Sequence, residues 1–150
     1  MQIKAMVALP VVLAGAAALA PQASANPYSG MDSAHVQYFS SPSDDIHCEI
    51  DFQRGYVNPT HPEWGVIPDA VYCTSVNPLQ KVQIRPDGSL ASVCANDPSC
   101  GSNGQHDEEV LAYGQSAVLG PFTCYSEESG MTCTADGRGF KISTPGIVTV

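Results

Sequence analysis

Positive charge is scarce in this sequence. Its 150 residues include only 6 Lys and Arg against 15 Asp and Glu, which gives a formal net charge of −9. Proteins that bind a phosphate backbone or anionic lipid use clusters of Lys and Arg to displace counterions. The composition therefore argues against nucleic acid and membrane surfaces as partners.

The sequence also lacks the short motifs that carry nucleophilic or metal chemistry. It contains no G-x-S-x-G elbow and no S-x-x-K pair to activate a serine hydroxyl. It has no C-x-x-C pair and no H-x(3–5)-H spacing, so the usual patterns of a zinc site are missing. We therefore predict a protein that is not an enzyme and has no cofactor or metal.

Long apolar runs occur only at the start of the chain. Lys4 precedes an apolar stretch over 5–20, and Ala23-Ser24-Ala25 follows it. This order is typical of a secretory signal peptide, with cleavage expected after Ala25. The run is shorter than the roughly 20 apolar residues of a transmembrane helix. We expect a protein secreted to the cell envelope or the extracellular space, with no membrane insertion after the signal is removed.

Three regions are predicted along the chain. They are the signal peptide at 1–25, a flexible arm at 26–36 that is rich in Pro, Gly and Ser at its start, and a single domain at 37–150. Without Lys4 the remaining chain has five basic residues against fifteen acidic ones, a net charge of −10. We expect this acidic domain to be a monomer.

All six cysteines follow the expected cleavage site, and an even number in an exported chain indicates disulfides. Fifteen pairings are possible in principle. We favour the sequential one, because the strand pattern brings neighbours in sequence together. The predicted bridges are Cys48–Cys73, Cys94–Cys100 and Cys124–Cys133. Loops of this size contribute roughly 2–3.5 kcal/mol each as upper estimates, and a fully paired set leaves no thiol for catalysis.

Alternation of apolar and polar residues predicts a mainly β fold, a small disulfide-stapled antiparallel sandwich or barrel. The clearest strand is 46–53, which is followed by a Pro-rich excursion over 58–68. Val118, Phe122 and Cys124 are expected to share one face of a later strand. Only 107–111 has a spacing that suggests a helical turn. Further strands are predicted at 71–73, 81–85, 89–93, 116–125, 130–135 and 140–143, with hairpin turns at Pro86-Asp87-Gly88 and Asp136-Gly137.

A weak internal repeat accompanies these strands. Ser41, Cys48 and Asp51 are spaced as Ser126, Cys133 and Asp136 are, and each set is followed by an Arg-Gly-aromatic triplet. Two interpretations stay open. The pattern indicates either two similar strand-turn-strand units, each with an Asp-Arg pair, or a chance match in a Ser- and Gly-rich chain.

Four histidines, His35, His47, His61 and His106, are candidates for bases or ligands. Alternation places His47 on the outward side of its strand with Glu49 and Asp51, and such a row can contribute to a Ca²⁺ or Zn²⁺ site. One face of an antiparallel sheet usually meets water. We therefore favour a solvated polar face.

The Pro-rich excursion offers a second candidate surface, because it contains Trp64. Together with Tyr28, Tyr56 and Tyr125, this side chain can form an aromatic contact patch. Large aromatic residues are well buried on average, so we favour Trp64 packing at the edge of the core. The 94–100 loop is a further candidate, since a pinned loop can be presented rigidly, as inhibitors present theirs.

A resemblance extends over nearly the whole domain. It is carried by 39–48, Val71-Tyr72-Cys73, Leu111-Ala112-Tyr113-Gly114, 119–124, 130–133 and 137–143. With these segments and an Ala- and Val-rich leader, the chain resembles small exported proteins of mycobacteria and related actinobacteria that form a domain of unknown function. The resemblance implies a place outside the cell or in its envelope, and it implies no activity, ligand or catalytic residue.

The sequence thus favours a non-enzymatic interaction protein of the envelope or its surroundings, with an extracellular protein or glycan as partner. The alternative is an inhibitor of, or an enzyme acting on, an extracellular substrate. Flat surfaces with an exposed Trp64 would favour the interaction protein. A pocket in which His47 or His61 meets a carboxylate and a hydroxyl would favour the enzyme.

Overall fold

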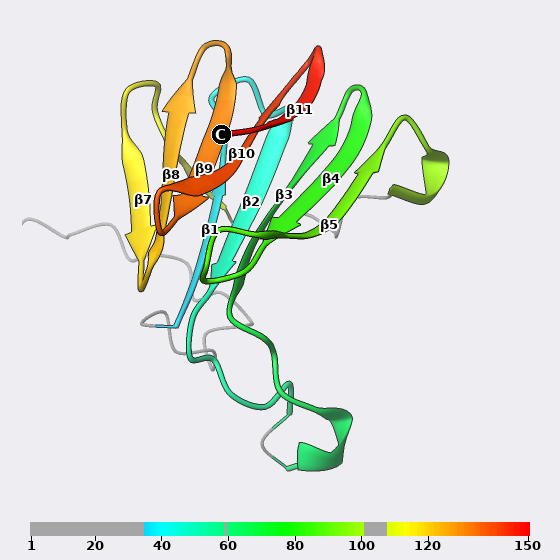
Figure 1. Cartoon of the computed structure of the whole chain (residues 1–150), viewed down its shortest axis with the longest axis vertical. Helices are drawn as coiled ribbons and strands as arrows, with labels where there is room; N and C mark the ends of the chain where they lie inside the picture. The colour runs from blue at the N-terminus through cyan, green and yellow to red at the C-terminus, as the bar shows by residue number, and fades with distance from the viewer. Residues whose placement is uncertain (1–34, 59, 101–107) are drawn as a thin grey trace, which may run out of the picture.

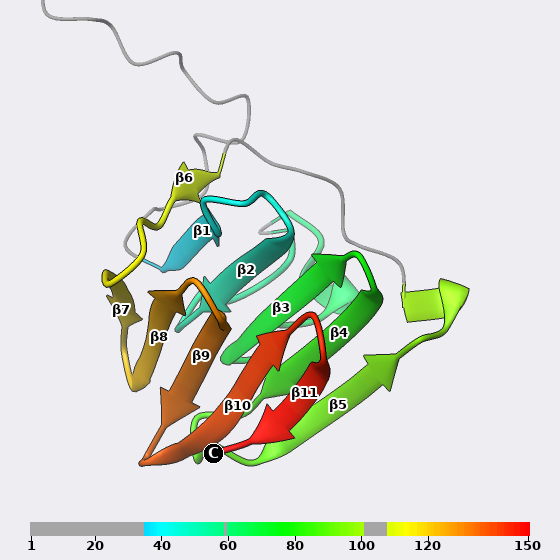
Figure 2. The same cartoon turned by 90° about the horizontal axis from the view of Figure 1, so that it is seen from above.

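The computed structural model describes residues 35–58, 60–100 and 108–150. The expected signal peptide, almost all of the arm, Tyr28 and His106 lie outside the described residues. The described chain forms two β-sheets that pack face to face (Figures 1 and 2). The predicted mainly β sandwich is confirmed, and the sheets do not close into a barrel. Val36, the last residue of the expected arm, belongs to the first strand.

The larger sheet has six strands in the order β5-β4-β3-β2-β1-β6. They are β1 (Val36–Ser40), β2 (Ile46–Asp51), β3 (Ala70–Val76), β4 (Leu79–Ile84), β5 (Leu90–Ala95) and β6 (Glu109–Val110). Neighbours pair antiparallel except β1 and β6, which run parallel. The expected helical turn at 107–111 is wrong for its described part, because β6 extends along β1 there.

The smaller sheet has five antiparallel strands in the order β11-β10-β9-β8-β7. They are β7 (Ser116–Leu119), β8 (Phe122–Glu127), β9 (Gly130–Ala135), β10 (Arg138–Ser143) and β11 (Gly146–Thr149). The predicted Asp136-Gly137 turn joins β9 to β10, with φ of 50° and 72°. Both values lie in the left-handed region that two-residue hairpin turns require and that Asp-Gly supplies. Two short 3-10 helices, η1 (Pro62–Trp64) and η2 (Pro98–Cys100), lie in connecting segments.

The core lies between the sheets, where alternate residues of the strands meet. Val118 is not part of it and is 57% exposed, contrary to expectation. The Gly120-Pro121 turn pairs Leu119 with Phe122, so Ala117 and Leu119 face inward with Phe122 and Val118 faces outward. The largest fully buried apolar side chains are Phe122, Phe140, Ile50, Ile84, Met131, Ile142, Val71 and Val82.

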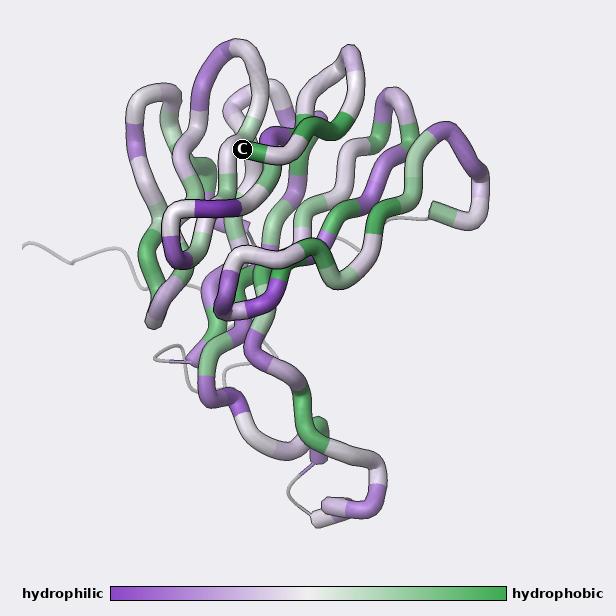
Figure 3. Tube along the Cα trace, in the orientation of Figure 1, coloured by the Kyte–Doolittle hydropathy of each residue, from purple (hydrophilic) through white to green (hydrophobic). Residues whose placement is uncertain are grey.

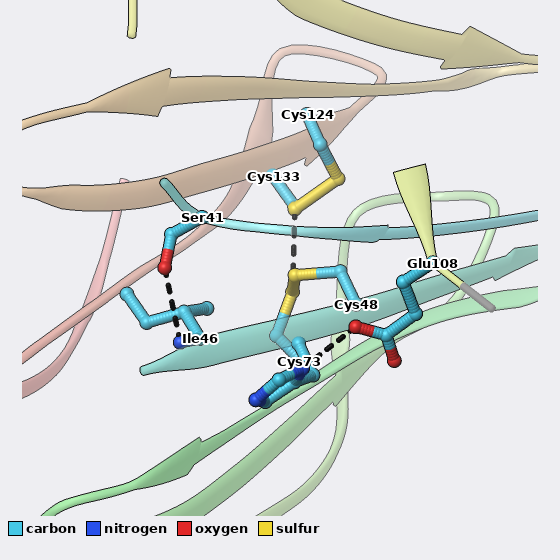
Figure 4. The surroundings of a disulfide bond; sticks show 8 residues. Ser41, Ile46, Cys48, Cys73, Glu108, Cys124 and Cys133 are labelled. Carbon is cyan, nitrogen blue, oxygen red and sulfur yellow. Dashed lines mark hydrogen bonds and ion pairs between the residues drawn. A yellow bond between two sulfur atoms is a disulfide. The ribbon is translucent and has the colours of Figure 1, made fainter. Parts of the chain in front are cut away.

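The three disulfides link the cysteines in the sequential order favoured from the sequence. Cys48–Cys73 joins β2 to β3, and Cys124–Cys133 joins β8 to β9, each between residues that are directly opposite in register. These two bridges also meet across the sandwich. The sulfur atoms of Cys73 and Cys133 are 3.7 Å apart (Figure 4). One disulfide per sheet therefore lies at the centre of the core, in contact with the other.

The internal repeat corresponds to two similar three-stranded units. In β1-β2-β3 one cross-strand row consists of Phe39, Cys48 and Cys73, and in β8-β9-β10 the matching row is Cys124, Cys133 and Phe140. Each row combines one disulfide with one phenylalanine, in opposite order. The expected Asp-Arg pair forms in the first unit. In the second unit the guanidinium of Arg138 donates instead to the carbonyl of Asp87, at 2.7 Å.

Candidate functional site

The most prominent surface feature is the segment 52–69 between β2 and β3, here called the projecting loop. It extends from the lower end of the sandwich in Figure 1, away from both sheets. Figure 3 shows apolar positions among the polar ones along it. Four of its large side chains are more than half exposed: Tyr56, Val57, Trp64 and Val66. A group of exposed apolar residues of this kind is typical of an interaction surface.

Trp64 does not pack against the core, so the expectation of a buried side chain is wrong. It is 62% exposed. It lies in η1, in a loop that leaves the end of the sandwich between the central strands β2 and β3, and the core contacts that would bury it are out of reach (Figure 1). The ring of His61 stacks on the indole, with centroids 4.6 Å apart and planes inclined by 10°. His61 Nδ1 also bonds Glu63 Oε1 at 2.9 Å, so this histidine helps to orient the tryptophan.

Main-chain hydrogen bonds give the projecting loop a defined shape. Val57 N–H donates to Gly65 O (3.0 Å), and Ile67 N–H donates to Gly55 O (2.8 Å), which makes a short two-stranded ladder. Gly65 has φ of 103°, a conformation that only glycine adopts readily, and it ends η1. The exposed side chains are therefore carried on an ordered hairpin.

A charged network fixes the base of the projecting loop to the sheet. Arg54, the third residue of the loop, places Nη1 2.8 Å from Glu49 Oε1 and 2.7 Å from Asp51 Oδ1. The hydroxyl of Tyr72, opposite Glu49 on β3, donates to Glu49 Oε2. Tyr38, opposite Glu49 on β1, lies on the other side. We call Glu49, Asp51 and Arg54, with these two tyrosines, the base network.

Burial and mutual repulsion shape the acid-base properties of the base network. Burial, together with the negative charge of Glu49, raises the pKa of Asp51 to about 7. Burial and the same carboxylate raise the pKa of Tyr38 to about 12. Asp51 thus holds a proton at pH values where an ordinary aspartate is ionised.

The row of His47, Glu49 and Asp51 is not a solvated face, contrary to the sequence-based expectation. The three residues are 7%, 7% and 4% exposed. Strand pairing places tyrosines on both sides of Glu49, and Arg54 folds back over the two carboxylates. The guanidinium occupies the position between Glu49 and Asp51 that a metal ion would need, so the row is neutralised by the protein's own cation.

His47 is directed away from the base network. Its Nδ1 is 2.6 Å from Glu108 Oε2, and its Nε2 is 3.0 Å from the carbonyl of Asp44. The imidazole therefore connects β2 to the segment that precedes β6. His35 lies at the start of β1, where its Nδ1 is 3.0 Å from the carbonyl of Phe52.

Two cavities bear on the enzymatic alternative. One of about 750 Å³ lies along the edges of β1 and β7, where Gln37 Nε2 donates to Val118 O at 3.3 Å. The other, of about 360 Å³, lies among turns at the end of the sandwich opposite the projecting loop. Neither is lined by His47 or His61. The arrangement of histidine, carboxylate and hydroxyl that an enzyme would need is thus not found in these two cavities.

Sequence reasoning missed part of the base network for identifiable reasons. The roles of Tyr38 and Tyr72 depend on the pairing of β1, β2 and β3, which no local pattern reveals. Arg54 did leave a signal, because it is the only Lys or Arg between Lys4 and Lys81. A lone cation three residues after a buried carboxylate indicates an ion pair.

The Cys94–Cys100 bridge closes an exposed segment around η2, with Cys100 itself buried.

Comparisons with protein-family models, curated proteins and solved structures found no match for this chain. None of the helices in the described part has the length and apolar character needed to cross a membrane. The contacts and exposures of the described residues therefore carry the functional argument.

Proposed function

We propose that this protein is a non-enzymatic interaction module of the cell envelope or the extracellular space, and that the projecting loop binds its partner. The observation that carries the proposal is the exposure of Trp64 on an ordered hairpin. The three disulfides and the leader sequence support a place outside the cytoplasm.

The mixture of side chains on the projecting loop favours a protein partner. Trp64 and Tyr56 are aromatic, whereas Val57 and Val66 are aliphatic. Protein interfaces concentrate their binding energy in a few aromatic anchors surrounded by apolar contacts. The base network and the main-chain ladder order the loop before binding, which lowers the entropic cost of association.

The test is affinity capture from envelope extract and culture fluid with three forms of the mature protein. These are the wild type, Trp64→Ala, and Val93→Ala as a control at an exposed valine on β5, remote from the loop. We expect one partner to be captured by the wild type and the control but not by Trp64→Ala. Loss of a tryptophan anchor costs about 2 kcal/mol, which is roughly a 30-fold weaker Kd.

The captured partner is then purified and titrated directly. Trp64 is the only tryptophan of the chain, so its fluorescence emission should shift to the blue as the partner covers it. A partner that binds Trp64→Ala and the wild type equally would contradict the proposed loop surface. Inhibition or turnover of a captured protease or other enzyme would instead support the alternative of an inhibitor or enzyme.

A further inference from the structure

The end of the sandwich opposite the projecting loop contains a concave polar site, here called the end pocket. Its cavity of about 360 Å³ is formed by the turns between β1 and β2, β3 and β4, β8 and β9, and β10 and β11, which lie at the upper end in Figure 1. This volume falls within the range of about 300–1,000 Å³ for small-molecule sites. The lining residues are Ser41, Ser43, Asp45, Ile46, Ser75, Asn77, Tyr113, Glu127, Glu128, Ser129, Gly130, Ser143, Thr144 and Pro145.

The chemistry of this lining is unusual in its density of hydroxyl groups. Five serines, one threonine and one tyrosine contribute hydroxyls, three carboxylates add acceptors and Asn77 adds an amide, while no Lys, Arg or His lines the pocket. A hydroxyl both donates and accepts, so such a lining complements a ligand that is itself rich in hydroxyls. Tyr113 adds a half-exposed aromatic ring.

A buried serine with an unpaired hydroxyl adjoins the lining of the end pocket. Ser126 is fully buried, faces the interior with Cys124, and its Oγ has no hydrogen-bond partner within the described residues. Its neighbour Glu127 lines the pocket. Its counterpart in the internal repeat, Ser41, lines the pocket as well, but Ser41 Oγ accepts from Ile46 N–H at 3.1 Å (Figure 4). Ser41 Oγ thus has a hydrogen-bond partner, whereas Ser126 Oγ at the matching position has none among the described residues.

Gln80 shows the same feature on the facing sheet. Its side chain is almost fully buried, and its Nε2 donates to the carbonyl of Ser143 at 2.9 Å, whereas its Oε1 has no partner among the described residues. Ser143 lines the end pocket, as does Ser75, which is opposite Gln80 in register. An unpaired buried polar atom costs about 1–3 kcal/mol. Both such atoms found among the described residues thus belong to residues that neighbour lining residues of the pocket, Glu127 in sequence and Ser75 in register.

The arrangement distinguishes between classes of ligand. An anion would meet Asp45, Glu127 and Glu128, and only Glu127 has a basic partner nearby, Lys141 Nζ at 3.0 Å. A metal ion needs several ligand atoms that converge on one point. Among the His, Cys, Asp and Glu side chains of the described residues, only the sulfur atoms of Cys48, Cys73 and Cys133 form such a group of three, and all three belong to disulfides. A neutral ligand with many hydroxyls fits both restrictions.

We infer that the end pocket is a binding site for a neutral sugar, either free or as the terminal residue of a glycan. Ser75 Oγ and Ser143 Oγ already donate to main-chain carbonyls, and Ser129 Oγ accepts from Lys141 Nζ, so these hydroxyls offer a sugar only their remaining lone pairs or proton. The carboxylates of Asp45 and Glu128 accept from the sugar hydroxyls, and the ring of Tyr113 packs against the apolar face of the pyranose. Neither Ser126 nor Gln80 lines the cavity, so their unpaired oxygens would take part only through a bridging water. The site is at the opposite end from the projecting loop and does not rest on the proposed protein partner.

The test is titration of the ¹⁵N-labelled mature protein with glucose, galactose, mannose and arabinose, and with glucuronate as an anionic control. Protein NMR shifts are followed up to about 10 mM sugar, ten times a millimolar Kd. We expect at least one neutral sugar to shift the amides of Ser43, Ser129 and Gly130. The indole N–H of Trp64 should not move, and glucuronate should bind at least tenfold more weakly.

Two tyrosines of equal exposure provide a matched pair of variants. Tyr113, at the pocket, is 42% exposed, and Tyr125, on the outer face of β8, is 41% exposed. Tyr113→Ala should weaken sugar binding at least tenfold, whereas Tyr125→Ala should leave it unchanged. A terminal glycan residue is distinguished from a free sugar by repeating the titration with a methyl glycoside, which a site for chain ends accepts.

Three results would overturn the inference. The first is the absence of shifts with every neutral sugar of the panel, and the second is equal binding by Tyr113→Ala and the wild type. The third is a response of the same amides to calcium chloride alone, which would identify an ion site. Trp64→Ala changes the projecting loop and retains the end pocket. It therefore distinguishes loss of sugar binding at the pocket from loss of protein binding at the loop.

Discussion

The two ends of the sandwich depart from the usual pattern of burial in opposite ways. At one end the projecting loop leaves Trp64 and its apolar neighbours in water. At the other, next to the end pocket, buried polar atoms of Ser126 and Gln80 have no partners among the described residues. Apolar groups in water and unpaired polar groups inside both cost free energy. The contrast underlies the two proposals, because the first end offers apolar side chains to a protein surface and the second offers polar groups to a small ligand.

The largest effect on the free energy of unfolding is expected at the base network, where Arg54 bonds two buried carboxylates. Arg54→Ala leaves Glu49 and Asp51 side by side and buried without a cation, which should lower the free energy of unfolding by about 3–5 kcal/mol. Urea unfolding followed by far-ultraviolet circular dichroism measures it. Arg85→Ala is the control, since Arg85 is exposed and bonds only Ser89 and the Leu90 carbonyl. Equal stability of the two variants would show that the network does not support the loop.

A change of opposite sign is expected at the end pocket. Ser126→Ala removes a buried hydroxyl that lacks a partner and should raise the free energy of unfolding by about 1 kcal/mol. Ser75→Ala should lower it by about the same amount, because Ser75 Oγ donates to the Pro78 carbonyl at 2.6 Å. Thermal unfolding of both variants in the absence of sugar makes the comparison. A loss of stability in Ser126→Ala would mean that its hydroxyl is satisfied in the protein.

A dependence of stability on pH is expected from Asp51 of the base network, at the loop end of the sandwich. Because the pKa of Asp51 is raised to about 7 from 3.8, the folded state holds a proton that the unfolded chain releases. Stability from this group is therefore complete below pH 4 and falls as pH rises towards 7, by at most ~1.4 kcal/mol per pH unit. Asp51→Asn, which mimics the protonated form, should lack this slope. Parallel stability curves for the two proteins between pH 4 and 7 would refute the assignment.

The smallest effect on stability is expected at the tip of the projecting loop. Trp64→Ala removes an exposed ring whose only described ring contact is the stack with His61. The free energy of unfolding should change by no more than about 0.5 kcal/mol. Chemical denaturation of the variant checks this. A loss of more than 2 kcal/mol would mean that Trp64 stabilises the fold, and the argument for a binding anchor would fail.

Local patterns predicted much of the framework. Alternation of apolar and polar residues identified β2, and Asp136-Gly137 identified the turn between β9 and β10. The even loop between Cys124 and Cys133 placed these residues opposite each other, as they are. Each of these features depends on neighbours in sequence, and strand periodicity and turn chemistry describe such neighbours well.

The surroundings of the strands could not be predicted in the same way. Alternation assigned Glu49 to the outer side correctly, but its burial depends on tyrosines from two other strands and on the path of Arg54. Trp64 was expected to pack because aromatic residues usually do, yet its location at the end of a long loop removes it from the core. The end pocket is formed by four turns that are distant in sequence, and no single segment contains its pattern.

The contact between the disulfides of the two sheets bears on how the ends act together. With the sulfur atoms of Cys73 and Cys133 3.7 Å apart at the centre of the core, each sheet has a covalent cross-link where it meets the other. The two bridges stiffen their own sheets at the place where the sheets pack against each other. The sandwich would thus act as a rigid spacer. A protein bound at one end and a glycan bound at the other would be kept at a constant separation and angle. Binding of one would raise the local concentration of the other.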